Sequence, residues 1–436
     1  MGSYIPCTAE EQKAMLAELG LKEPSDLFSH IPAEVRTETL DIPQGMSEME
    51  VSRAMDARSS RNTRFASIFR GAGAYWHYIP AIVRTVTSKE EFLTAYTPYQ
   101  AEISQGVLQS IFEYQTQICE LTGMDVSNAS MYDGASASAE AVFMCEERKR
   151  SGVLLPQSVD PQIRQVIKTY CESRSVPVTE IPADSGVADL QAVQEALGSG
   201  NAASVFVQSP NYWGLLEPVE ELAASAHAHG AKLIMNANPI SLGLFKSPGE
   251  LGADVAVGEG QPMGMPLSFG GPYIGFLACR KDMMRRLPGR IVGQTEDAQG
   301  RRCFVLTLQA REQHIRREKA SSNICSNEAL CAMTVSVYLA AMGAKGLHQA
   351  AASCYAHAHY LAGELEKIGF KRVHKGEFFH EFLTTCPCGT QKLSDRLAAS
   401  GILSGLPLDG NMLWCCTEMN SRSDMDKLIS IAREVC

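Results

Sequence analysis

The sequence predicts an α/β protein with a mostly parallel sheet, preceded by a helical arm and followed by a small α+β domain. Between residues 124 and 345, short apolar runs alternate with amphipathic runs, which is the rhythm of βαβ units. The composition then changes at Gly369. At roughly 150 residues per domain, 436 residues allow two or three domains. We predict an N-terminal arm over residues 1–60, a large domain over 61–345 and a C-terminal domain with its leading helix over 346–436.

Charge and cysteine usage limit the classes of function. The net charge of −10 argues against nucleic acid or an anionic membrane surface as the main partner. The most apolar stretch, Leu330–Ala344, is shorter than the ~18 residues of a membrane span. No secretory leader is visible, so we expect fourteen reduced thiols and a cytoplasmic location. Cys386-Pro-Cys388 and Cys415-Cys416 lack zinc-site spacing, so we expect no metal. The basic cluster from Arg280 to Arg302 fits a solvated helix and loop, or a docking surface for an acidic partner.

The arm begins with a helix signal. Thr8 and Glu11 have the spacing of a capping box, and Met15, Leu16 and Leu19 follow as an apolar face. So short an amphipathic helix cannot bury that face by itself. We therefore expect the arm to lie on another surface.

Residues 61–123 carry two aromatic motifs, Gly71–Pro80 and Thr94–Gly106, followed by an expected helix over Val107–Thr122. Their tyrosines either fill the core, with hydroxyl groups hydrogen-bonded, or line a pocket shared with another chain. The candidates for such a pocket are Tyr75, His77, Tyr96, Tyr99 and Gln100.

The expected sheet strands are Val153–Pro156, Val205–Gln208, Lys232–Asn236, Val255–Val257 and Ile274–Ala278, with helices at Pro161–Ser173, Leu190–Leu197 and Pro218–Gly230. A helix also begins near Gly134, Ala135 and Ser136, where free amide groups make a candidate anion site. Close packing on the sheet explains these small residues equally well.

Two further segments are candidates for a site. In Ala253–Gly275, a buried strand opens into a glycine-rich loop, which is where α/β enzymes commonly bind a ligand. Ser321, Ser322 and Asn323 form a polar cluster that we expect to cap a helix start. The C-terminal part follows a helix over Ala350–Ile368 and is expected to contain strands Phe378–Thr385 and Met412–Thr417 and helices Ser394–Ser400 and Asp424–Val435.

Taken together, these motifs closely resemble the P-protein (glycine decarboxylase) family of the glycine cleavage system, and within it the alpha, or first, subunit of the two-chain form. The resemblance extends over nearly the whole chain. It implies the aspartate-aminotransferase-like fold, fold type I of the pyridoxal phosphate (PLP) dependent transferases. One departure lies at Trp76, where the commonest family form has Asp.

The resemblance also implies that this chain lacks the residues that hold the coenzyme. Gln261 stands where the family's catalytic chain has the Schiff-base lysine, and Asn236 stands where an Asp pairs with the pyridinium nitrogen. PLP chemistry needs both an amine and a carboxylate. Gly134, Ala135 and Ser136 would then be a relic phosphate cup, and we expect no catalytic residue and no covalent cofactor in this chain.

The implied function is that of a non-catalytic subunit. It pairs with a PLP-carrying beta subunit that decarboxylates glycine and passes the aminomethyl group to lipoylated H-protein, with the other glycine cleavage components as further partners. Tyr75, His77, Tyr96, Tyr99, Gln100, Ser321, Ser322 and Asn323 are the candidates for contacts in trans. Two alternatives remain open: a self-sufficient PLP enzyme using Lys246 or Lys281, and a non-enzymatic PLP- or glycine-binding regulator.

Overall fold

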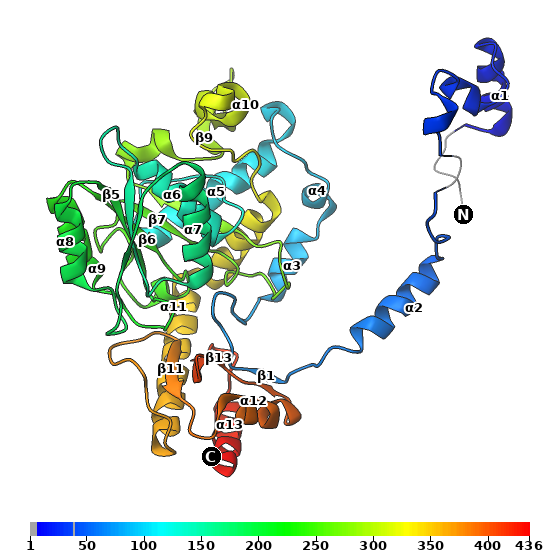
Figure 1. The fold of residues 1–436 in the computed structure, drawn as a ribbon. Helices are drawn as coiled ribbons and strands as arrows, with labels where there is room; N and C mark the ends of the chain where they lie inside the picture. Colours follow the sequence, from blue (N-terminus) through cyan, green and yellow to red (C-terminus); the bar gives the residue numbers. More distant parts are fainter. Residues whose placement is uncertain (1–6, 38–39) are drawn as a thin grey trace. The chain divides into compact units, whose positions relative to one another are not determined.

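The structure, a computed structural model, describes residues 7–37 and 40–436. The chain forms two compact units, Met1–Thr63 and Arg64–Cys436 (Figure 1). We describe each unit by itself, and the domain boundaries predicted at 60/61 and 345/346 stay predictions.

Unit 1 consists of short helices: α1 (Ala9–Glu18), the 3₁₀ helices η1 (Pro24–Phe28) and η2 (Ala33–Val35), and α2 (Glu48–Ser59). The predicted capping box of Thr8 and Glu11 is confirmed, and Ser47 and Glu50 form a second one. Leu16 is the only buried residue among those described in this unit. Most of its other large apolar side chains are exposed, among them Leu19, Leu27, Phe28, Val35, Leu40, Ile42, Met46, Met49, Val51 and Met55. Unit 1 therefore has almost no core of its own, as we expect of an arm.

The centre of unit 2 is a seven-stranded sheet in the order β2-β8-β7-β6-β5-β3-β4 (Figure 1). The strands are β2 (Val126–Ser127), β3 (Gly152–Pro156), β4 (Val178–Ile181), β5 (Ala202–Gln208), β6 (Lys232–Asn236), β7 (Val255–Glu259) and β8 (Gly275–Cys279). Strands β7, β6, β5, β3 and β4 pair in parallel, while β8 is antiparallel to both of its neighbours. The mostly parallel sheet and its five expected strands are confirmed; β2 and β4 were not expected.

Helices cover both faces of this sheet, and successive strand residues alternate between two apolar clusters. In β6, Leu233 and Met235 pack into one cluster with α5 (Gln105–Thr122), α8 (Leu190–Gly198), α9 (Val219–Ala228) and α11 (Ala329–Lys367). Ile234 points to the other face, into a cluster with α6 (Gly134–Cys145) and α7 (Pro161–Ser173). Because both faces are buried, strands such as β3 are continuous apolar runs.

The shorter elements that precede α11 in the chain are β1 (Ser67–Ile68), α3 (Ala81–Thr87), α4 (Glu90–Leu93), η3 (Ala101–Ile103), η4 (Ser241–Gly243), η5 (Lys281–Arg286), β9 (Ile291–Glu296), β10 (Arg302–Thr307), η6 (Gln309–Arg311), α10 (Gln313–Arg316) and η7 (Arg317–Lys319). The basic cluster predicted as a solvated helix and loop, or as a docking surface, contains a 3₁₀ helix and the antiparallel β9–β10 hairpin, and most of its basic side chains are exposed. Arg290 is buried, so it does not belong to a solvated surface.

The C-terminal elements form a separate apolar cluster around Trp414. They are β11 (Glu381–Thr385), α12 (Thr390–Ala399), β12 (Ile402–Leu403), β13 (Leu406–Leu408), β14 (Asn411–Cys415) and α13 (Arg422–Val435). The sheet β11-β14-β13 is antiparallel, and β1 pairs with β12. The expected strands and helices are all present, with ends shifted by up to four residues.

Helix α11 is longer than the apolar stretch that we expected to fall short of a membrane span. Among the described helices, it alone is long and apolar enough to cross a membrane by length and composition. However, Gly343 has non-helical angles that divide it in two. Its first half packs with the sheet through Val335 and Tyr338, and its second half packs with the C-terminal cluster through Leu361. These contacts are those of a core helix.

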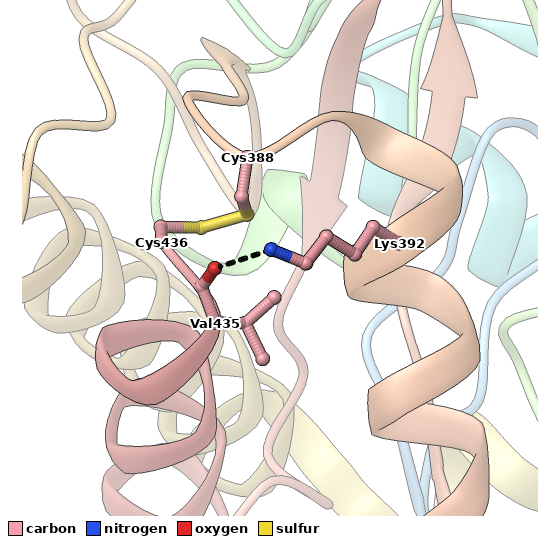
Figure 2. The surroundings of a disulfide bond; sticks show 4 residues. All are labelled: Cys388, Lys392, Val435 and Cys436. Atoms are coloured by element: carbon pink, nitrogen blue, oxygen red, sulfur yellow. Dashed lines mark hydrogen bonds between the residues drawn. A yellow bond between two sulfur atoms is a disulfide. The ribbon is translucent and has the colours of Figure 1, made fainter.

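A disulfide between Cys388 and Cys436 corrects the expectation of fourteen reduced thiols (Figure 2). It forms because the end of α13 lies beside the segment that enters α12, with the two Cα atoms 4.7 Å apart. Lys392 Nζ donates a hydrogen bond to the carbonyl oxygen of Val435 at 3.0 Å in the same place. The chain end is thus fixed by one covalent and one polar contact.

We expect Cys436→Ser to lower the free energy of unfolding by up to about 4 kcal/mol, because the bond closes a loop of 48 residues and restricts the unfolded chain. Urea unfolding with and without reductant measures this effect. Reductant should bring the wild type to the level of Cys436→Ser and leave that variant unchanged, and Cys386→Ser, at a free cysteine, is the control. Equal wild-type stability with and without reductant would contradict a disulfide in solution.

Candidate functional site

A cavity of about 350 Å³ lies where β6 and β7 end and where α6 and α7 begin. The segment 72–75 and the start of β11 complete its wall. Its polar lining residues are Tyr75, Asp133, Asp160, Gln162, Gln208, Asn236, Asn238, Glu259, Tyr273, His380 and Glu381. The predicted position of the site, at the carboxyl ends of the strands and the glycine-rich loop, coincides with this cavity.

Asn236 is the last residue of β6 and lines the cavity. Its Nδ2 donates to Ser138 Oγ at 3.1 Å, and Ser138 Oγ donates to the carbonyl oxygen of Gly134 at 2.7 Å. The amide is therefore linked to the first turn of α6. An uncharged amide in this position cannot balance a cationic ring.

Gln261 joins the loop after β7 to the segment that carries Tyr75. Its Oε1 accepts from the amide of Tyr75 at 2.9 Å, and its Nε2 donates to the carbonyl oxygens of Tyr75 at 2.9 Å and Met265 at 2.8 Å. The side chain is 1% exposed and is not among the residues that line the cavity. The position expected for the lysine is thus occupied by a side chain that cross-links backbone.

The first turn of α6 is a helix N-terminus, as expected of a phosphate cup, but it already holds two carboxyl groups of this chain. Glu259 Oε2 accepts from the amide of Gly134 at 3.0 Å, and Asp133 Oδ1 accepts from the amide of Ser136 at 2.7 Å. A side chain at position 134 would place its Cβ 2.8 Å from the backbone nitrogen of Glu259, so only glycine permits this approach. Burial raises the pKa of Glu259 to about 7.

Glu381 connects the cavity to the first aromatic motif. Its Oε1 accepts from the amide of Ala72 at 2.7 Å, and its Oε2 accepts from the hydroxyl of Tyr75 at 2.8 Å. Gly71 packs so closely that a Cβ there would lie 2.4 Å from Glu381 Oε1. Burial raises the pKa of Glu381 to about 7. Tyr75 is therefore fixed within this chain by its own backbone and hydroxyl contacts.

His77 lies two residues further along and enters a different network. Its Nδ1 is 2.8 Å from Glu418 Oε2, to which Cys354 Sγ also donates at 3.2 Å, while the amide of Tyr78 donates to Glu418 Oε1 at 2.7 Å. Within the described part of the chain, His77, Cys354 and Glu418 are the group whose possible metal-ligand atoms lie within 4.8 Å of one another. Those atoms already hydrogen-bond to each other, and the absence of a metal stays a prediction.

The second aromatic motif lies on the surface. Tyr96 is 86% exposed and Tyr99 55%, and Gln100 is exposed as well. Arg290 Nη2 donates to the Tyr99 hydroxyl at 2.7 Å, and its Nη1 donates to Asn327 Oδ1 at 3.3 Å. Arg290 thus holds Tyr99 beside the segment that precedes α11.

Ser321, Ser322 and Asn323 do not cap a helix, which corrects that expectation. Helix α11 begins only at Ala329, and residues 320–328 have no regular secondary structure. Ser322 Oγ accepts from the amide of Ile324 at 3.1 Å, and Arg174 donates to the carbonyl oxygen of Ser321 at 3.3 Å. Ser321 and Asn323 are exposed.

The eight residues predicted to make contacts in trans therefore occupy three places in this chain: Tyr75 lies at the cavity, His77 lies in the Glu418 network, and the other six are exposed or, for Ser322, partly exposed. Sequence reasoning missed Glu259, Glu381, Asp160 and Glu418. One signal was visible for Glu259, since it follows an apolar strand and opens the glycine-rich loop. The others depend on contacts between distant segments.

The residues present do not fit PLP. No lysine or arginine stands among the described residues that line the cavity. Two of the three amide groups expected to bind the phosphate, those of Gly134 and Ser136, are taken by the carboxyl groups of Glu259 and Asp133, which would repel it. Size is not the obstacle, because cavities of ~150 Å³ already hold a benzene ring.

Comparison with solved structures places the fold in a known class. Mouse CSAD in apo form superposes with a TM-score of 0.68 at 15% identity, covering 95% of this chain and 92% of that chain. Together with the sheet order and the site at the strand ends, this defines the fold as that of the fold-type I, PLP-dependent transferases, as expected from the sequence.

The particular family follows from closer relatives. The crystal structure of glycine decarboxylase (P-protein) of the glycine cleavage system, in inhibitor-bound form, matches with a TM-score of 0.94 and 40% identity over 100% of both chains. The "Probable glycine dehydrogenase (decarboxylating) subunit 1" of Desulfitobacterium hafniense is 48% identical over 99% of this chain and 100% of its own length. The glycine cleavage system P-protein family model matches residues 2–432. The chain belongs to the P-protein family.

Proposed function

We propose that this chain is the coenzyme-free subunit 1 of a two-subunit glycine dehydrogenase (decarboxylating), whose beta subunit carries PLP. The observation that carries the proposal is the cup of α6, where Glu259 and Asp133 occupy two of the amide groups that a coenzyme phosphate would need. Gln261 and Asn236 add to it, because both are held by hydrogen bonds within this chain and neither offers the required amine or carboxylate.

The alternative of an atypical lysine has no support in the cavity. Lys246 Nζ pairs with Glu220 at 2.7 Å and is exposed, and Lys281 is exposed after β8. Neither lines the cavity.

The surface residues support a role in assembly. Leu93, Tyr96, Tyr99 and Ile103 are large side chains exposed within eleven residues of one another, and Arg290 fixes the position of Tyr99. Exposed apolar groups gathered in this way favour a protein contact. We assign this region, the 321–323 segment and the apolar faces of unit 1 to contacts with the beta subunit, which would complete the beta subunit's active site.

The beta subunit would decarboxylate glycine and transfer the aminomethyl group to lipoylated H-protein. The proposed location is the cytoplasm. Its support is cysteine usage, since twelve of the fourteen cysteines are free thiols in the structure despite the Cys388–Cys436 bond.

The test is glycine–bicarbonate exchange with added PLP and H-protein. We expect no exchange and no visible coenzyme absorbance from this chain alone, and exchange when it is mixed with its beta subunit. The beta subunit alone should also show no exchange, because residues of this chain would be needed to complete its active site. Exchange by this chain alone, or by the beta subunit alone at the rate of the mixture, would overturn the proposal.

A further inference from the structure

Another cavity, of about 240 Å³, lies apart from the one at the strand ends, and the two share no lining residue. Its walls come from α6, the end of α7, η5 and the segment before α11. Its polar lining combines guanidinium, carboxyl and hydroxyl groups, those of Arg174, Arg285, Arg286, Glu140, Ser321 and Ser322. The cavity therefore presents both signs of charge to an occupant.

Glu140 is the buried acidic group of this cavity. It is 5% exposed, although it lines the cavity from the middle of α6. Burial raises the pKa of its carboxyl group to about 7, and the hydroxyl of Ser322 and the charge of Arg174 offset burial only in part. A carboxylate can accept about four hydrogen bonds, so one hydroxyl donor leaves most of this capacity unused. A buried carboxyl group with so few donors indicates an occupant that supplies more of them.

Arg174 is held on the cavity wall by groups other than Glu140. Its Nη2 donates to Glu146 Oε2 at 3.1 Å, and its Nη1 donates to the carbonyl oxygen of Ser321 at 3.3 Å. Its guanidinium group lies 4.0 Å from the centre of the Phe143 ring. This arginine is therefore fixed in place, and its charge contributes to the field in the cavity without pairing with Glu140.

Arg285 and Arg286 supply donors that an acidic ligand could use. Arg286 Nη1 donates to the carbonyl oxygens of Met144 and Glu146 at 3.0 Å each, which holds the guanidinium group at the end of α6. The N–H groups on its Nη2 and Nε take no part in these two bonds. Arg285 is exposed and lines the same cavity. Because a guanidinium group binds a carboxylate through a fork of two N–H groups, this wall suits a carboxylate.

We propose that this cavity binds a small amino acid as a zwitterion, with its ammonium group donating to Glu140 and its carboxylate accepting from Arg285 and Arg286. Simpler ions fit only part of the wall. An anion without an ammonium group would face the Glu140 carboxylate, and a cation without a carboxylate would face three guanidinium groups, and like charges repel. A zwitterion meets each charge with its opposite.

The experiment uses the full chain without PLP, and the probes are glycine and β-alanine, which differ by one CH₂ group between their two charges. Titration calorimetry and the shift in melting temperature measure binding. Acetate carries the carboxylate alone, methylamine carries the ammonium group alone, and inorganic phosphate tests for a plain anion site. We expect at least one of the two amino acids to bind and to raise the melting temperature. The three controls should bind at least about tenfold more weakly.

Two variants test the two walls separately. Glu140→Gln removes the charge and keeps the size of the side chain, and it should fold because burial already favours the neutral form of this group. Arg285→Gln changes an exposed position and leaves the contacts of Arg286 intact. Each should weaken amino-acid binding by about tenfold or more. Glu366→Gln and Arg433→Gln, exposed on α11 and α13, are the matched controls and should bind like the wild type.

Three outcomes would each overturn the proposal. The first is no binding of either amino acid up to millimolar concentrations. The second is unchanged binding by Glu140→Gln or by Arg285→Gln. The third is binding of acetate, methylamine or phosphate as tight as that of the amino acids. The assay needs neither the beta subunit nor H-protein, so its failure is distinct from failure of the proposed subunit function.

Discussion

Replacing Glu418 by alanine should lower the free energy of unfolding by about 3–5 kcal/mol, the range found when one partner of a buried pair is removed. Glu418 accepts from the amide of Tyr78 and the thiol of Cys354 and contacts His77 Nδ1 at 2.8 Å. These groups are buried or partly buried, and His77 Nε2 already lacks a partner. With the carboxylate gone, all three donors would lose their acceptor at once. Urea unfolding of the variant and the wild type at neutral pH measures the difference.

The same carboxylate predicts a loss of stability in acid. Burial opposes ionisation of Glu418, but the hydrogen bond and charge of His77 and the amide of Tyr78 outweigh burial and lower its pKa to about 2. A carboxyl group with a lowered folded-state pKa contributes its full stability above its unfolded value of about 4.3 and loses it as the pH falls toward the folded value. Between about pH 4.5 and pH 2, the wild type should lose roughly 3 kcal/mol from this group.

The neutral variant Glu418→Gln separates this effect from general acid denaturation. It should be less stable than the wild type at pH 7. Between pH 4.5 and pH 2, its free energy of unfolding should fall much less steeply with falling pH than that of the wild type. Glu366→Gln, at an exposed position on α11, should keep the wild-type slope. If Glu418→Gln kept that slope too, the His77–Glu418 contact would not be its source.

The sheet was predictable because its central strands are buried on both faces. Strand β6 was predicted at its observed ends, and β3, β5 and β8 differ from prediction by one to three residues. Strand β4 was not, because it is an edge strand with exposed Thr179 and Glu180, so its sequence has no apolar run. The β9–β10 hairpin was not predicted for a similar reason. Half of β9 is exposed and polar, and the arginines around it are typical of a solvent-exposed segment.

The location of the site was predictable, and its polar contacts were not. Strand ends and glycine-rich loops leave a local signal, so the cavity could be placed at β6 and β7. The contact of Tyr75 with Glu381 joins residues 306 positions apart, and that of His77 with Glu418 joins residues 341 positions apart. Such pairs depend on how the C-terminal elements pack onto the first aromatic motif, which no local pattern encodes. For this reason Tyr75 and His77, two residues apart, could not be separated into different networks beforehand.

Introducing the lysine and the aspartate that PLP chemistry requires should not give this chain glycine decarboxylase activity. We expect the variant Gln261→Lys/Asn236→Asp, by itself, to release no CO₂ from glycine in the presence of PLP. A lysine at position 261 can donate to the carbonyl oxygens of Tyr75 and Met265 but cannot accept from the amide of Tyr75, as Gln261 does. That buried amide would be left without a partner, at a cost of about 1–3 kcal/mol. In addition, position 261 does not contribute to the lining of the cavity, so the new lysine would replace a side chain that does not face it.

The cup is the further obstacle, because Glu259 would still hold the amide of Gly134 in the double variant. Adding Glu259→Gln removes its charge and keeps an oxygen that can accept from that amide. We therefore expect this triple variant to retain more PLP after dialysis than the double variant, measured by visible absorbance, while a melting curve establishes that each variant is folded.

Glycine-dependent CO₂ release from the folded double variant alone would show that two substitutions suffice and that the carboxyl groups around the cavity are no barrier. Equal retention of PLP by the double and triple variants would remove Glu259 from the explanation and leave the backbone contacts of position 261 as the cause.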